Sequence, residues 1–174
     1  MKLLQASSIL AIAATLAATT ISAIAANQNI LPSATNTPAT LIAQGESTPL
    51  AKQLQGKPVV VDIYASWCPG CKNIAPTLAQ LRRQYAGKAN FVALDVSDSK
   101  KMQASMKTAA KLGLTSFFNA NKAQTATIAI IDPATGKVTQ QFRNNADLTA
   151  YTSILNSSIA QMGSGDAMKK ALDK

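Results

Sequence analysis

The chain has 174 residues, of which 47% are apolar, so it is long enough for one domain with a hydrophobic core and too short for two ordinary domains. Its 17 lysines and arginines and 8 acidic residues give a formal net charge of +9. This charge favours acidic partners and disfavours self-association, so we expect a monomer. The cations are dispersed and are not interleaved with aromatic residues, which argues against a nucleic-acid-binding protein.

The N-terminus has the pattern of a secretory signal peptide. Lys2 is followed by an uncharged stretch over residues 3–26, which is apolar between residues 9 and 24 and ends in small residues of the Ala-x-Ala type. We therefore expect residues 1–26 to be a signal peptide that is removed on export. The alternative is an uncleaved membrane anchor, because the uncharged stretch approaches the ~20 residues that span a bilayer.

Three further segments complete the predicted organisation. Residues 27–48 are rich in Ala, Thr, Asn, Ser and Pro and lack hydrophobic periodicity, so they are predicted to be a flexible linker. The folded domain is predicted over residues 49–162. Gly163 and Gly165 then open a charged segment, and residues 163–174 are predicted to be a mobile tail.

The domain is predicted to begin with a strand and an amphipathic helix. Residues 49–54 are predicted to form a short helical turn, and the apolar run at 59–64 is predicted to be a strand. From residue 68 to 85, apolar residues recur at three- and four-residue steps, which predicts a helix. Pro76 lies inside it and is expected to kink it, because proline lacks the N–H and crowds the preceding turn.

The next segments continue the alternation. Residues 91–96 are predicted to be a second strand. Asp98 and its serine neighbours are cap candidates for a helix that runs to about residue 112 and ends at Gly113. Residues 114–124 have no clear period and are predicted to be a loop with room for one helical turn.

The last elements are a hairpin and a helix. Residues 127–131 and 138–142 are predicted to be the two arms of the hairpin. Apolar residues between 148 and 162 mark one face of a last helix that starts near residue 145. Strands joined through helices lie parallel, whereas the arms of a hairpin pair antiparallel. The order therefore predicts an α/β fold with a mixed central sheet and helices on both faces.

The chain's two cysteines, Cys68 and Cys71, stand directly after the first predicted strand and at the start of the first helix. This arrangement makes one thiol acidic and exposed and puts the other within disulfide reach. Export places both outside the reducing cytosol, where a disulfide persists. A disulfide across so short a loop removes little entropy from the unfolded chain. The pair is therefore predicted to do thiol–disulfide chemistry rather than to form a structural disulfide.

The segment around the cysteines resembles the thioredoxin-fold family. The resemblance is carried by residues 61–72, with the order Val-Asp-Ile-Tyr-Ala-Ser-Trp-Cys-Pro-Gly-Cys-Lys, and by Pro76 at the family's helix kink. It covers about residues 48–162 and is strongest to exported thioredoxin-like proteins of the bacterial periplasm or thylakoid lumen. It implies a thioredoxin-like fold, a location outside the cytoplasm, and disulfide exchange with protein substrates without a cofactor. Similar proteins serve cytochrome c maturation or lumenal redox control.

The resemblance also implies roles for three residues. Cys68 would be the attacking thiol, Cys71 the resolving thiol of the redox-active disulfide, and Asp62 a buried carboxylate beneath Cys71. A helix N-terminus favours the Cys68 thiolate, and Asp62 can accept the proton of a shielded Cys71. The alternative for Asp62 is an exposed position at a strand edge.

Further residues are candidate substrate contacts, namely Trp67, Pro69, Gly70, Ala126 and Thr127. Trp67 either faces the substrate or packs beside the turn. Pro69-Gly70 reverses the Gly-Pro order of thioredoxin at a position that tunes the redox poise of the family, so the direction of electron flow stays open. The Asp62 position favours reduction of substrates, with a membrane donor returning the electrons.

Other departures from the family concern the surroundings of the cysteines. Ala93 stands where the family has a lysine near the buried carboxylate, so the pKa of that carboxylate is expected to rise by desolvation. Ala126 stands where the family has a cis-proline. A non-proline cis bond costs roughly 2.5–4 kcal/mol, so we expect either a trans or a strained peptide there. Residues 114–125 are an insertion, in which Phe117 and Phe118 either cover the site or plug the edge of the core.

Two other functions compete with the enzyme. Without the shielding proline, Cys-x-x-Cys turns from two chains could together hold zinc or an iron–sulfur cluster. One chain, with two cysteines and no histidine, cannot complete a four-ligand site of this kind. The other alternative is a redox-inactive thioredoxin-fold adaptor that grips one partner with the inserted loop.

Overall fold

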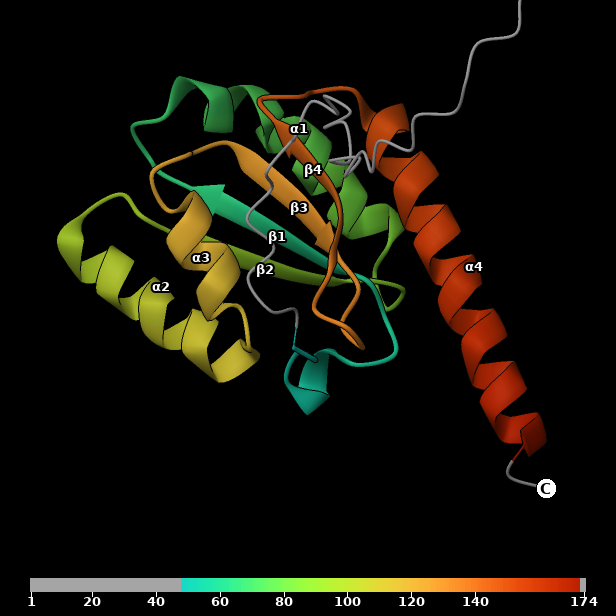
Figure 1. Ribbon diagram of the computed structural model, residues 1–174. Coiled ribbons are helices and arrows are strands. Elements are labelled where there is room, and N and C mark those ends of the chain that lie inside the picture. The colour runs from blue at the N-terminus through green and yellow to red at the C-terminus, as the bar shows by residue number, and fades with distance from the viewer. Residues whose placement is uncertain (1–47, 173–174) are drawn as a thin grey trace, which may run out of the picture. The chain divides into compact units, whose positions relative to one another are not determined.

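The computed structural model describes residues 48–172, in which strands and helices alternate along most of the chain (Figure 1). The elements are η1 (Lys52–Leu54), β1 (Val59–Tyr64), α1 (Pro69–Gln84), β2 (Asn90–Asp95), α2 (Ser99–Leu112), α3 (Thr115–Asn121), β3 (Thr127–Ile131), β4 (Val138–Arg143) and α4 (Leu148–Leu172). The predicted signal peptide, and the predicted linker apart from Thr48, lie outside the described residues.

The strands form one mixed sheet in the order β2-β1-β3-β4. β1 pairs parallel with β2 and antiparallel with β3, and β3 pairs antiparallel with β4. β1 and β3 are the central strands, and all their residues except the half-buried Tyr64 are buried. Their apolar runs therefore form the middle of the core, and the mixed sheet predicted from the sequence is confirmed.

Helices cover both faces of the sheet, as predicted. In Figure 1, α2 and α3 lie over one face, and α1 and α4 lie over the other. Asp98 accepts a hydrogen bond from the Lys101 N–H at 2.8 Å and caps the start of α2. Gly113 ends α2 in the left-handed conformation, with a φ of 78°. The predicted cap residues therefore set both ends of this helix.

The segment predicted to be a loop at 114–124 contains a helix, α3. Only Phe118 and Asn121 of this seven-residue helix are buried, which leaves too few apolar positions for a helical period to be recognised. Phe118 is 1% exposed, and Phe117 is partly buried against the core. Packing at the edge of the core is therefore the better interpretation of the two phenylalanines.

The last helix, α4, is longer than predicted. It continues to Leu172, whereas the sequence predicts an end near residue 162 and a mobile tail at 163–174. The helix passes through Gly163 and Gly165, because an isolated glycine lowers helix propensity by about 1 kcal/mol without removing a hydrogen bond, unlike proline. Among the described residues, none of the helices combines the length and the apolarity needed to cross a membrane.

Replacement of Gly163 by alanine tests whether α4 continues past that residue. Alanine is more favourable than glycine in an exposed helix interior by about 0.5–1 kcal/mol, and nothing lies within 4 Å of the added Cβ. We expect Gly163→Ala to raise the helical circular dichroism signal and to slow amide hydrogen exchange in the following turn. The control is Gly87→Ala, which has equally open space but a φ of 74° and should destabilise the protein. An unchanged signal and exchange rate in Gly163→Ala would show that this segment is not helical.

Candidate functional site

Cys68 lies in the turn between β1 and α1 and is the N-cap residue of α1. Its Sγ accepts a hydrogen bond from the Cys71 N–H at 3.2 Å. Pro69 occupies the first helical position, where a missing N–H costs nothing and the fixed φ favours a helix, so the sequence starts α1 at this point. The Cys68 sulfur therefore lies at the positive end of the helix dipole.

Opposing effects act on the Cys68 thiol. Burial raises its pKa, because only 5% of the residue is exposed. Hydrogen bonds from the Cys71 thiol, the Thr125 side chain and the N–H groups of Cys71 and Gly70 outweigh burial and hold the pKa of Cys68 below its ordinary value of 9.0. The thiol is acidic, as predicted. The prediction that it is exposed is wrong, because Cys68 is buried among the core residues.

Cys71 lies one helical turn further along and is 3% exposed. Its Sγ lies 4.0 Å from the carbonyl oxygen of Ile63, to which the S–H donates. Burial, and next the hydrogen bond with the Cys68 sulfur, raises the pKa of Cys71 to about 11. Both cysteines are free thiols in this structure. The pair therefore combines one thiol whose pKa is lowered with one that stays protonated at neutral pH.

Asp62 lies on the central strand β1 and is 5% exposed. It is a buried carboxylate, and the alternative of an exposed strand edge is wrong. Among residues 48–172, its Oδ1 finds no hydrogen-bond partner. Burial raises the pKa of Asp62 to about 6, and the Arg82 guanidinium offsets part of that rise. Ala93 is the direct neighbour of Asp62 on β2, so no cationic side chain stands at that position.

Ala126 and Thr127 do not line an open surface. Ala126 is 2% exposed, its N–H donates to the Ile63 carbonyl, and its own carbonyl accepts from the Asn144 N–H, both at 2.9 Å. Thr127 is fully buried in β3. In this structure, Ala126 has both backbone groups paired and Thr127 is enclosed, so their role as substrate contacts stays a prediction. Ala126 has a φ of 60°, a left-handed conformation that costs a non-glycine residue about 1–2 kcal/mol, so the strain predicted here is present.

Gly70 lies tightly against Ala126 and Asn144. A Cβ at position 70 would lie 3.0 Å from the Ala126 Cβ and 3.2 Å from the Asn144 Oδ1, which is closer than side chains normally pack. Asn144 has a φ of 48°, and its Oδ1 accepts a hydrogen bond from the Asn73 Nδ2 at 3.0 Å. Asn144 belongs to no motif. Its only signal in the sequence is its residue type, because asparagine tolerates left-handed backbone after a strand.

The rim of the site is formed by Trp67 and Pro69, which are both exposed. Trp67 is 61% exposed, and its indole N–H donates to the Ser97 carbonyl at 2.9 Å, so the side chain is not buried beside the turn and is open to a substrate. In the part of the chain that the structure describes, no group of three or more His, Cys, Asp or Glu residues is placed to hold a metal ion. The arrangement can support attack by Cys68 on a disulfide, followed by attack of Cys71 on Cys68.

The contact between Gly70 and Ala126 predicts a coupled pair of substitutions. Gly70→Ala should lower the free energy of unfolding by about 1–3 kcal/mol, because the added Cβ overpacks the contact. Ala126→Gly removes the opposing Cβ and relieves the left-handed strain. In the double variant, the loss measured by urea unfolding should be smaller than the sum of the single effects by about 0.5 kcal/mol or more. Strictly additive effects would contradict the contact.

The buried charge of Asp62 predicts a stability cost that depends on pH. Its pKa rises from 3.8 to about 6 on folding, so the folded state binds this proton more tightly and loses stability as the pH rises from about 4 to 6. Asp62→Asn removes the charge and keeps the shape, so it should stabilise the protein by up to about 3 kcal/mol at pH 7 and by little at pH 4. Urea unfolding at both pH values measures this, with the exposed Asp147→Asn as the control. A gain of equal size at both pH values would exclude the buried charge as its cause.

Comparisons with known proteins bear on this arrangement. The family model described as Thioredoxin matches residues 44–129. A thiol:disulfide interchange protein TxlA homolog from Synechocystis is 45% identical over 53 residues, which are 30% of this chain and 29% of that protein. The chloroplastic thioredoxin-like protein HCF164 from Arabidopsis thaliana is 47% identical over 45 residues, which are 26% of this chain and 17% of that protein. The chain thus spans less than a third of the length of these relatives.

A solved structure, a thiol:disulfide interchange protein of the thioredoxin family from Chlorobium tepidum, has a TM-score of 0.47 and 20% identity to this chain, and the match covers 65% of this chain and 95% of that one. The fold expected from the sequence is present in the strand order, in the helices on both faces and in the Cys-x-x-Cys turn after β1. Together with the family match over residues 44–129, these features identify this part of the chain as a thioredoxin domain.

Proposed function

We propose that this chain is an extracytoplasmic thiol–disulfide oxidoreductase that reduces disulfides in protein substrates. The observation that carries the proposal is that two thiols within one helical turn have pKa values shifted in opposite directions. The pKa of Cys68 is lowered, and that of Cys71 is raised to about 11. A single reactive thiol would stay attached to its substrate, whereas a second thiol within reach completes the exchange.

The exchange takes two steps. In the first, the Cys68 thiolate attacks one sulfur of the substrate disulfide, a bond forms between these two sulfurs, and the other substrate sulfur leaves as a thiolate. In the second, Cys71 loses its proton and attacks the Cys68 sulfur. The Cys68–Cys71 disulfide forms, and the remaining substrate sulfur leaves as a thiolate. Two electrons have then passed from the dithiol to the substrate, which takes up two protons.

We propose Asp62 as the acceptor of the Cys71 proton. Its pKa of about 6 leaves the carboxylate ionised at neutral pH, and its Oδ1 has no hydrogen-bond partner among the described residues. Asp62 directly precedes Ile63, whose carbonyl oxygen accepts from the Cys71 thiol. Asp62, the proposed proton acceptor, is therefore the chain neighbour of Ile63, whose carbonyl oxygen is bonded to the Cys71 thiol.

A location outside the cytoplasm is supported by the signal-peptide pattern of residues 1–26 and by relatives that are named as a thiol:disulfide interchange protein and a chloroplastic thioredoxin-like protein. A reductase must be returned to its dithiol form after each cycle. We propose that a membrane-bound dithiol donor supplies the two electrons. Attack of the donor thiolate on the Cys68–Cys71 disulfide would transfer them by the same chemistry.

Cysteine variants test the exchange. Cys71→Ser should accumulate a mixed disulfide with a protein substrate on non-reducing gels, because the resolving thiol is missing. Cys68→Ser should accumulate none and should lose turnover. Iodoacetamide labelling of Cys68 in the reduced protein should show a pH midpoint below that of an unperturbed cysteine in a model peptide. A fully reduced Cys71→Ser that traps no substrate would contradict the proposal.

The reduction potential of the pair tests the proposed direction. Equilibration with glutathione buffers should give a value near the roughly −270 mV of thioredoxin. A value near the roughly −120 mV of a strong oxidant would reverse the direction and leave the exchange chemistry in place.

A further inference from the structure

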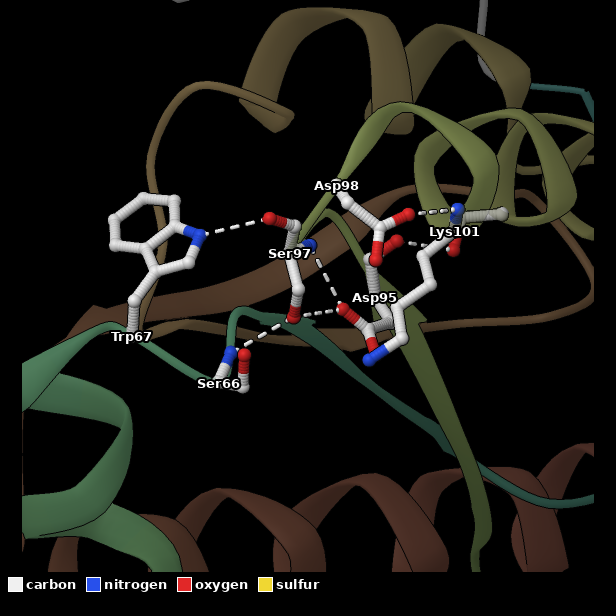
Figure 2. Close-up of polar contacts among 7 residues, drawn as sticks. Ser66, Trp67, Asp95, Ser97, Asp98 and Lys101 are labelled. Carbon is white, nitrogen blue, oxygen red and sulfur yellow. Dashed lines mark hydrogen bonds and ion pairs between the residues drawn. The ribbon is translucent and has the colours of Figure 1, made fainter.

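Hydrogen bonds join the loop after β1 to the loop after β2, as Figure 2 shows. The Ser66 N–H donates to the Ser97 Oγ at 2.8 Å, and the Trp67 indole N–H donates to the Ser97 carbonyl at 2.9 Å. Ser97 therefore holds the two residues that immediately precede Cys68.

Asp95, the last residue of β2, fixes Ser97 in turn. Its Oδ1 accepts from both the Ser97 N–H, at 2.8 Å, and the Ser97 hydroxyl. Its Oδ2 forms an ion pair with the Lys101 Nζ at 3.2 Å, and its carbonyl accepts from the Ser105 hydroxyl of α2. Burial acts to raise the pKa of Asp95, but the bonds from Ser97 and Lys101 outweigh it and hold the pKa below its usual range. Asp95 therefore holds Ser97 in place in its charged carboxylate form. Asp95 is itself held by β2 and by its bonds to Lys101 and Ser105 of α2.

Trp67 is 61% exposed and directly precedes the reactive Cys68, whereas the other exposed large apolar side chains, Met106, Met168 and Leu172, belong to α2 and α4. Exposed tryptophans contribute strongly to protein–protein contacts, because they bury a large rigid surface. A side chain that rotates freely must be ordered when a partner binds, and that ordering weakens binding. An indole that is already held by Ser97 avoids this loss.

We propose that Asp95 is a positioning residue for substrate docking, which acts through Ser97 to hold the Trp67 indole in one orientation beside Cys68. The partner is a protein chain that carries the disulfide and lays its surface on the indole. The docking consequence rests on the proposed disulfide exchange, whereas the positioning of the indole does not. A small disulfide has no protein surface to lay on the indole, so its reduction needs no such support.

The chain offers a direct reporter, because Trp67 is its only tryptophan and intrinsic fluorescence therefore reports this indole alone. We expect Asp95→Ala to lower the fluorescence anisotropy of Trp67 and to raise its quenching by acrylamide. Ser97→Ala, which removes the hydroxyl bonded to both Ser66 and Asp95, should act in the same direction. The matched control is Asp98→Ala, which removes a neighbouring carboxylate bonded to the Lys101 N–H rather than to Ser97.

Kinetics test the docking consequence. In Asp95→Ala, the KM for a protein disulfide should rise roughly 3- to 10-fold with kcat nearly unchanged, because only the ordering of the indole is lost. The rate with a small aliphatic disulfide should stay within about 2-fold of the wild type, which a general distortion of Cys68 would not allow. Asp95→Asn keeps an acceptor for the Ser97 N–H and should recover part of the anisotropy and of the KM.

The two readouts separate the possible failures. Unchanged anisotropy in both Asp95→Ala and Ser97→Ala would overturn the positioning role. Lower anisotropy with an unchanged KM for the protein disulfide would overturn the docking role. If the wild type reduces no protein disulfide, the proposed function fails and the docking role fails with it, while the fluorescence comparison still decides whether Asp95 positions the indole.

Discussion

One hydrogen bond, from the Cys71 N–H to the Cys68 sulfur, connects the start of α1 to the reactivity of the thiols. As an N-cap, the sulfur pairs a backbone donor that the helix itself cannot satisfy. As a nucleophile, it is stabilised in its thiolate form by the same donor. The reactive form of Cys68 is therefore also the form that caps α1 best. Conversion to a neutral disulfide weakens this cap, because a charged acceptor makes the stronger hydrogen bond.

The space around the Ile63 carbonyl is a second constraint. This oxygen accepts the Ala126 N–H at 2.9 Å and lies 4.0 Å from the Cys71 sulfur. A proline at position 126, as the family has, could not donate the first of these bonds. Ala126 in turn leaves no room for a Cβ at Gly70. The Pro69-Gly70 order and the alanine at position 126 therefore belong to one local arrangement, in which the absence of a Cβ at Gly70 lets the Ala126 side chain pack against it.

The elements that were predictable from the sequence have a strong local signal. β1 is an apolar run, and α1 starts with a proline after a capping residue, so both follow from neighbouring residues alone. Asn144 and Ser97 were not predictable, because no local pattern shows which distant loops meet the cysteine turn. The strain at Ala126 could be predicted from the missing proline. Its left-handed form depends on hydrogen bonds to Ile63 and Asn144 that exist only in the folded chain.

Asp62 shows how core stability and reactivity oppose each other. Its burial costs stability at neutral pH, and a lysine on the neighbouring strand would reduce that cost. The same lysine would lower the pKa of Asp62 and make it a weaker acceptor for a thiol proton. With Ala93 at that position, Arg82 moderates the pKa, which remains about 6. A base with a pKa just below the ambient pH is ionised and still binds a proton readily. The departure at Ala93 therefore favours the proposed proton transfer at the expense of stability.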